Sequence, residues 1–311
     1  MRVFPALIVA SLAAWGAVPA MPEGFRTLYS LDYALALRIF EDETRQRPED
    51  PEAWNHLAQG LLHRALFHAG ALDSSAFGPG SPFLKRPKVP MADEDQARFE
   101  QAIRKSLALC EARLQKNPLD TGCLYASGVA HAHQAQWALW VKQSWREALR
   151  EGTRSRQAHE KLMQLEPELA DAFLIPGLHE YIAGSLPWYV KALAFLAGYR
   201  GDRREGIEHM QRAVTGGRKT AVEARVMLAV VLRREKEFAR AAQLMEELVA
   251  AFPANHLYRR EEILLLAEAG DEPRARLRLR ELQNSGLLPA EKIESFSASV
   301  GEILARRTKA R

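Results

Sequence analysis

The chain repeats its own pattern at a spacing of 34 residues near its C-terminal end. Apolar and small residues of one segment recur in the next segment at the same offsets. The matched positions are Leu232 with Leu266, Ala241 with Ala275, Met245 with Leu279, and Leu248 with Leu282. A fixed period of this length indicates stacked supersecondary units. The 311 residues are therefore expected to form one elongated array and not two compact domains.

Each period is predicted to form two helices. Gly270 and Asp271 lie where the turn between the two helices falls, and Pro253 follows the second helix of the earlier unit. Small residues recur where two helix backbones approach, because Ala or Gly leaves room for close contact. This pattern resembles the tetratricopeptide repeat (TPR). The resemblance implies an all-α, TPR-like helical-hairpin solenoid that winds as a right-handed superhelix.

The same offsets recur towards the N-terminus, as a proline, then Trp, Leu or Phe six residues on, then a small residue. The positions are Pro48 and Trp54; Pro118, Leu124 and Gly128; Pro167, Phe173 and Gly177. Asp50 and Pro51 add a helix start, an N-cap followed by proline at the first helical position. We expect about five repeat-like units between residues 30 and 285, within an array over 21–288. A capping helix and a basic tail would occupy 289–311.

The first twenty residues follow the three-part pattern of a secretory signal peptide. A basic start at Arg2 precedes an uncharged apolar run from Phe4 to Val18, and Ala20 ends the expected cleavage site. The run is shorter than the roughly 20 residues that span a bilayer. The sequence therefore predicts an exported protein, periplasmic in a Gram-negative cell, with residues 1–20 removed. An N-terminal membrane anchor is the alternative.

Two insertions interrupt the repeats. Residues 70–90 are rich in Gly and Pro and carry Lys85, Arg86 and Lys88, which fits either a surface loop or a binding loop. Residues 185–199 contain Lys191 as their only charged residue, and apolar side chains would lie on every side of a helix there. Such a helix is either buried in the groove or meets a partner or a membrane surface.

The segment Ser185 to Gly206 also resembles a particular TPR family. The residues that carry the resemblance are Leu186-Pro187, Lys191, Leu193, Phe195-Leu196, Gly198, Gly201-Asp202-Arg203 and Glu205-Gly206. They look like the signature segment of the eukaryotic inclusion-body-clearance and outer-mitochondrial-membrane TPR family, and are similar to exported TPR proteins of bacteria. The eukaryotic relatives imply lipid-associated protein handling, without catalytic residues. The signal peptide and the shorter chain depart from them.

Motifs for catalysis or metal binding are not found in the sequence. Ala183 breaks the zinc motif that His179-Glu180 would begin. His56 and His63 share a helix face but stand roughly 10 Å apart along it, too far for one zinc ion. There is no glycine loop for phosphate and no marked nucleophile. We therefore predict a protein that is not an enzyme and has no metal and no cofactor.

Cys110 and Cys123 flank the turn at Pro118 on consecutive helices, at similar distances from it. In an exported protein two such cysteines can form a disulfide. Cys110 also occupies a core position, where a buried thiol behaves as a small apolar group. A disulfide and a buried pair of thiols both remain open from the sequence.

The remaining candidate surface is the concave groove, which the first helices of TPR units line. The residues that the repeat frame turns towards this groove are Asn55, Gln59, Tyr125, Val129, Leu174, Leu178, Tyr181, Val226, Val230 and Arg233. Amide, aromatic and apolar side chains in this mixture suit an extended peptide or a helix with apolar anchors. Lys plus Arg exceeds Asp plus Glu by only 4, which argues against nucleic acid as the partner.

The sequence thus predicts a non-enzymatic, exported interaction scaffold or chaperone-like adaptor that binds a protein or peptide segment in the groove. The alternative is a ligand-binding accessory component of a transport system, with an apolar pocket formed around residues 185–199. In that case an apolar small ligand or a membrane surface would be the partner.

Overall fold

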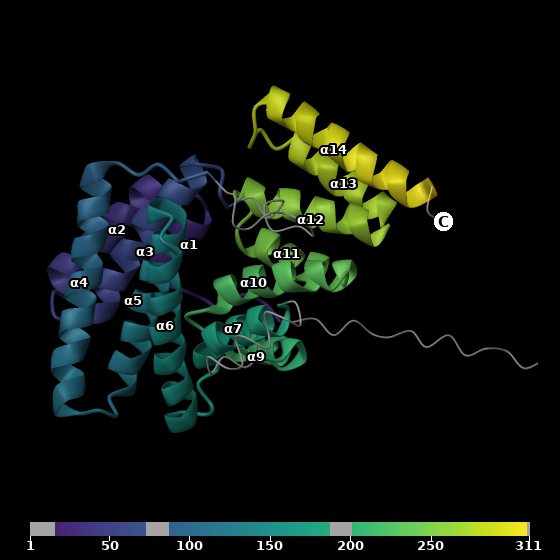
Figure 1. The fold of residues 1–311 in the computed structure, drawn as a ribbon. Coiled ribbons are helices and arrows are strands. Elements are labelled where there is room, and N and C mark those ends of the chain that lie inside the picture. Colours follow the sequence, from purple (N-terminus) through teal and green to yellow (C-terminus); the bar gives the residue numbers. More distant parts are fainter. Residues whose placement is uncertain (1–15, 73–86, 187–200, 310–311) are drawn as a thin grey trace, which may run out of the picture.

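Figure 1 shows the computed structural model, which describes residues 16–72, 87–186 and 201–309. In these ranges every regular element is a helix. The α-helices are α1 (Glu23–Tyr29), α2 (Tyr33–Gln46), α3 (Pro51–His68), α4 (Asp93–Lys116), α5 (Thr121–Trp137), α6 (Trp145–Leu165), α7 (Leu174–Gly184), α9 (Arg203–Gly216), α10 (Ala221–Arg234), α11 (Phe238–Ala251), α12 (His256–Ala269), α13 (Glu272–Gln283) and α14 (Ala290–Lys309). A π-helical turn, η2 (Ala138–Lys142), follows α5, and a 3₁₀ turn, η3 (Ala170–Phe173), precedes α7.

Several helices begin where a short polar side chain accepts a hydrogen bond from a backbone N–H of the first turn. These N-caps are Asp32, Asp50, Asp120, Asp202, Asn255 and Asp271. The first-turn N–H groups of a helix have no partner inside it, so each cap satisfies donors that would otherwise depend on water. The predicted start at Asp50 and Pro51 is confirmed.

Consecutive helices pack against one another along the chain. In Figure 1, α1 to α6 form one side of the molecule, and α9 to α14 are stacked one above another on the other side. The prediction of an all-α fold is confirmed, and the order of packing is that of a helical array.

Glycine stands at the predicted crossing points because the neighbouring helix leaves no space for a Cβ. A Cβ at Gly128 of α5 would lie 2.4 Å from the His159 ring of α6. A Cβ at Gly177 of α7 would lie 2.9 Å from the carbonyl oxygen of Gly206 on α9. The small positions that the sequence placed at 128 and 177 are therefore confirmed.

The last helix, α14, packs against the end of the array. Phe296, Val300 and Leu304 are buried on one side of α14, which packs against α12 and α13. These residues recur every four positions, so one face of α14 is apolar and the other remains polar.

The N-terminal segment and both insertions are described only in part. Of the predicted signal peptide, residues 16–20 belong to the described chain, and the carbonyl oxygen of Gly16 accepts a hydrogen bond of 2.8 Å from Arg225. Residues 1–15, 73–86 and 187–200 lie outside the described residues, and with them most of the predicted insertions at 70–90 and 185–199. No described helix combines the length and the low polarity that crossing a membrane requires.

Candidate binding site on the inner face

The predicted groove residues lie in the interior or at its edge. Asn55, Gln59, Tyr125, Leu174, Tyr181 and Arg233 are buried, and Val129, Leu178, Val226 and Val230 are half-buried. None of them is an exposed residue. We call the surface where α1, α3, α5, α10 and α12 meet the inner face, and part of the predicted set lies there.

The structure brings Asn55, Gln59 and Tyr125 together and places two other predicted residues elsewhere. The Asn55 amide donates a hydrogen bond of 2.8 Å to the carbonyl oxygen of Ala126, next to Tyr125. Tyr181 instead donates to Glu235 at 2.9 Å. Arg233 forms ion pairs with carboxylates of α12. The predicted groove residues therefore take part in separate contacts and do not all lie together.

A polar group that the sequence did not predict lies at the centre of the inner face. We call it the inner cluster, and it consists of Tyr29, Gln59, Glu223, Asn255 and Tyr258. The hydroxyl of Tyr29 and the amide of Gln59 both donate to Oε1 of Glu223, the latter at 2.7 Å. Asn255 donates to the backbone carbonyl of Tyr29 at 2.7 Å. Only Gln59 was expected here, because partners 164 to 226 residues apart leave no periodic signal in the sequence.

The environment of Glu223 disfavours its charged form. Burial raises the pKa of Glu223, and the Asp171 carboxylate acts in the same direction, while hydrogen bonds from Tyr29 and Gln59 lower it. Burial, and then the Glu223 carboxylate, also raise the pKa of Tyr29 and of Tyr258. Glu223 is half-buried as a residue, but its Oε2 is enclosed and has no hydrogen-bond partner in the part of the chain that the structure describes. Oδ1 of Asn55 is likewise enclosed and has no hydrogen-bond partner among the described residues.

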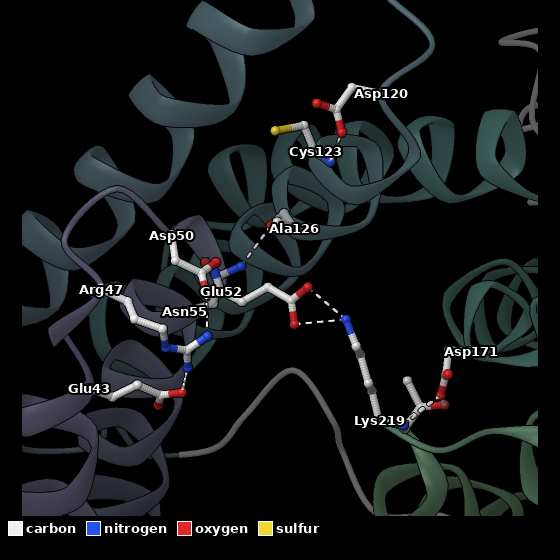
Figure 2. Close-up of polar contacts among 11 residues, drawn as sticks. Glu43, Arg47, Asp50, Glu52, Asn55, Asp120, Cys123, Ala126, Asp171 and Lys219 are labelled. Carbon is white, nitrogen blue, oxygen red and sulfur yellow. Dashed lines mark hydrogen bonds and ion pairs between the residues drawn. The ribbon is translucent and has the colours of Figure 1, made fainter.

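A second set of contacts ties the α9–α10 loop to the start of α3 (Figure 2). One oxygen of Asp171 accepts hydrogen bonds from the backbone N–H groups of Arg218, Lys219 and Thr220, each at 2.8 to 2.9 Å. In this position Nζ of Lys219 lies 2.6 and 2.8 Å from the two carboxylate oxygens of Glu52. The same ammonium lies 4.7 Å from the ring centre of Tyr125.

Three histidines on or near the inner face are held neutral. Burial lowers the pKa of His56 and His63 to about 4 and that of His133 to about 3. Neither ring nitrogen of His133 has a hydrogen-bond partner among the described residues. Charging any of these imidazoles in the folded protein is costly, so all three make the fold more stable at high pH than in acid.

Among the described residues, one group has the geometry of a metal site. Ligand atoms of Glu180, Glu205 and His209 lie within 4.8 Å of one another. Nδ1 of His209 is 2.7 Å from Glu180, whose hydrogen bond raises the pKa of the histidine. The sequence predicted no metal site, and this group was not among the predicted residues. Its signal was the spacing of four between Glu205 and His209, which places both on one helix face.

Cys110 and Cys123 are buried side by side between α4 and α5, as the helix frame predicted. Both are free thiols in the structure. Burial, together with the neighbouring Cys123, raises the pKa of Cys110. The disulfide between them stays a prediction.

No protein-family model matches the chain, and no curated protein sequence matches it. The fold places the chain in the class of all-α proteins built as an array of helices.

Proposed function

We propose that this protein is a non-enzymatic interaction scaffold or chaperone-like adaptor of the TPR type, which binds a segment of a partner protein on its inner face. The TPR assignment rests on the 34-residue period, the packing of consecutive helices, and the glycines at the α5–α6 and α7–α9 crossings. A right-handed superhelix is part of the same proposal.

One observation supports recognition at the inner face more than any other. Residues from separate units that the repeat frame assigned to the groove, Asn55, Gln59 and Tyr125, converge there. Asn55 is 2% exposed, yet its acceptor oxygen has no hydrogen-bond partner. A buried acceptor without a donor costs about 1–3 kcal/mol, and a bound partner that supplies a donor would recover that free energy.

Export is a further part of the proposal, supported by the basic, apolar and small-residue regions of residues 1–20. N-terminal sequencing of the protein recovered from the native cell tests it. A new N-terminus at Met21 supports export, and Met1 in the mature protein contradicts cleavage.

The binding proposal is tested by crosslinking and pull-down with Tyr125→Ala, which changes the inner face, and with the double variant Tyr125→Ala/Tyr181→Ala, which adds a predicted groove residue that lies elsewhere. We expect partner capture to fall about tenfold or more, since buried tyrosines are frequent binding hot spots, while helical content stays unchanged. Trp145→Ala is the control, because this tryptophan of α6 is 44% exposed and lies outside the proposed site. Tyr125→Phe/Tyr181→Phe separates recognition from packing. Capture that is equal in the double variant and the wild type argues against the inner face.

A small-ligand function is the second candidate. The hydrogen bond between Gln59 and Glu223 joins α3 directly to α10, which favours a small ligand over an extended peptide at that point. Such a protein would serve as an accessory component of a transport system. The apolar pocket that the sequence placed around 185–199 falls mainly outside the described residues. Native mass spectrometry distinguishes the candidates, because a co-purified lipid or metabolite supports the second and a clean apo mass supports the scaffold.

A further inference from the structure

We propose that the inner cluster is a binding site for an organic ammonium group, which would donate to Oε2 of Glu223 and lie against the neighbouring tyrosine rings. This inference rests on the proposed binding function and names the chemistry that the inner face recognises.

The first argument is the direction of the missing hydrogen bonds. Both donors that reach Glu223, the hydroxyl of Tyr29 and the amide of Gln59, bind the same oxygen, Oε1. Oε2 is enclosed and has no partner. The second unpartnered atom, Oδ1 of Asn55, lies one helical turn from Gln59 and is also an acceptor. Two acceptors without donors match a ligand that brings N–H groups better than they match an anion.

The second argument is charge. The Asp171 carboxylate acts on Glu223 and adds negative potential. The neighbouring cation, Lys219, is already bound to Glu52. Arg225, on the same helix as Glu223, pairs with Glu247 of α11. Within the described residues no cation pairs with Glu223, so the charged form of this carboxyl is unfavourable until a cation binds.

The third argument is the aromatic surround. Tyr29 packs edge-on against Phe252 with 5.5 Å between ring centres, and Phe252 packs on Tyr258 at 6.1 Å. Rings next to a carboxylate are the usual setting for ammonium recognition, through cation–π attraction. The inner face already contains one example from its own chain, since the Lys219 ammonium sits between the Glu52 carboxylate and the Tyr125 ring.

These features select an organic cation over a metal ion. The cluster supplies one carboxylate, whereas Ca²⁺ takes six to eight oxygen ligands and Mg²⁺ near-ideal octahedral geometry. An ammonium needs only one or two acceptors and an apolar or aromatic wall. Glu223 and Tyr258 are half-buried, so the cluster reaches solvent at these two residues. The ammonium belongs either to a free small amine or to a lysine side chain of the partner segment.

Isothermal titration of the full chain with n-butylammonium tests the site, with n-butanol as the neutral probe of similar size. We expect saturable binding of the ammonium and none of the alcohol. Glu223→Gln keeps the shape and removes the charge, and should weaken binding about tenfold or more, as expected for a lost charge-assisted hydrogen bond. Tyr258→Leu should weaken it several-fold. Glu208→Gln, at an exposed carboxylate of α9, is the control for unspecific attraction and should change nothing.

A peptide with a single central lysine, compared with its norleucine counterpart, distinguishes the two sources of the ammonium. Tighter binding of the lysine peptide than of butylammonium assigns the site to a partner side chain, and the reverse assigns it to a free amine. Absent binding of both, or equal binding by wild type and Glu223→Gln, overturns the inference.

The same variants separate this inference from the proposed function. Partner capture that survives in Glu223→Gln but fails in Tyr125→Ala/Tyr181→Ala keeps the scaffold and removes the ammonium site. Binding of butylammonium without any partner capture keeps the site and removes the scaffold. Glutamine keeps an acceptor oxygen for Tyr29 and Gln59 and has no charged form for burial to disfavour, so we expect Glu223→Gln to fold.

Discussion

Gly206 shows at the scale of one residue how tightly α7 and α9 are packed. A Cβ at this position would lie 2.6 Å from the carbonyl oxygen of Gly177 and from the backbone nitrogen of Tyr181. Backbone atoms cannot move aside as the end of a side chain can. We therefore expect Gly206→Ala to destabilise the protein by roughly 1–3 kcal/mol, measured by urea denaturation.

Gly301→Ala is the matched control. Gly301 lies exposed inside α14, and a Cβ there would meet nothing within 4 Å. This change should stabilise the protein by about 0.5–1 kcal/mol, because alanine restricts the unfolded chain and favours the helix. A Gly206→Ala variant as stable as the wild type would contradict the close approach of α7 and α9.

The buried His133 leads us to predict how the free energy of unfolding changes in acid. Burial lowers its pKa to about 3, so the folded state keeps it neutral, while the unfolded chain binds a proton near pH 6.5. Its stabilising effect is complete above pH 6.5 and is lost as the pH falls towards 3. At pH 5 this residue alone should lower the free energy of unfolding by on the order of 2 kcal/mol relative to pH 7.5.

The measurement is the free energy of unfolding of wild type and His133→Phe at both pH values. Phenylalanine has a similar size and cannot be protonated, so the variant should lose about 2 kcal/mol less between pH 7.5 and 5. The pKa values of His56, His63 and His179 are lowered to about 4 by burial, and these residues keep part of the acid sensitivity in both proteins. Parallel pH profiles would show that His133 is not the buried neutral group described above.

Residue-level predictions from the sequence were correct where a local rule governs the position. Gly128 and Gly177 were found from their offset to a proline, and Asp50 from its place before Pro51. Glu223 and Asn255 could not be found in this way. Their roles depend on Tyr29, which is close to them only in the folded chain, and neither residue type is unusual on a helix or at its start.

At the scale of elements, Cys110 and Cys123 report on the packing of α4 against α5. Both thiols are buried, and burial raises the pKa of each, so the reactive thiolate is rare in the folded protein. For protein prepared without added oxidant, we expect Ellman's reagent to find two thiols in denaturant and none in the native state. Zero thiols in denaturant would instead establish the disulfide that export favours.

Element boundaries show what the sequence pattern can and cannot predict. The cap Asp50 and the following Pro51 made the start of α3 predictable. The π-helical turn η2 and the 3₁₀ turn η3 were not predicted. The backbone N–H of Val89 donates to the carbonyl of Trp140 inside η2, so this turn depends on a segment that is distant in sequence.

At the scale of the whole molecule, the repeat pattern predicts an array but not how its ends meet. Each unit follows the same local rules, whereas a contact between the first and the later units occurs once and has no period. Such contacts join Gln59 to Glu223 and Tyr29 to Asn255. They explain why Asn55, Gln59 and Tyr125 are buried residues, although the repeat frame alone turns them towards an open groove.

The last prediction concerns Asn255, because its side chain makes both a local contact and a contact with a segment distant in sequence. Its Oδ1 accepts from the N–H groups of Leu257 and Tyr258 and caps α12, while its Nδ2 donates to the carbonyl of Tyr29 at the end of α1. Asn255→Ser keeps a good cap but is too short for the bond to Tyr29. Leaving that buried carbonyl without a donor should cost about 1–3 kcal/mol. Asn255→Ala should cost about 1 kcal/mol more, since it also removes the cap.

Hydrogen exchange locates the two effects. We expect faster exchange of the α1 amides in both variants, because α1 then loses its attachment to α12, and faster exchange at the start of α12 only in Asn255→Ala. The two losses should also appear in urea denaturation as a smaller and a larger shift of the midpoint. Unchanged protection of α1 in both variants would mean that Tyr29 and the apolar contacts around it hold the two ends together without Asn255.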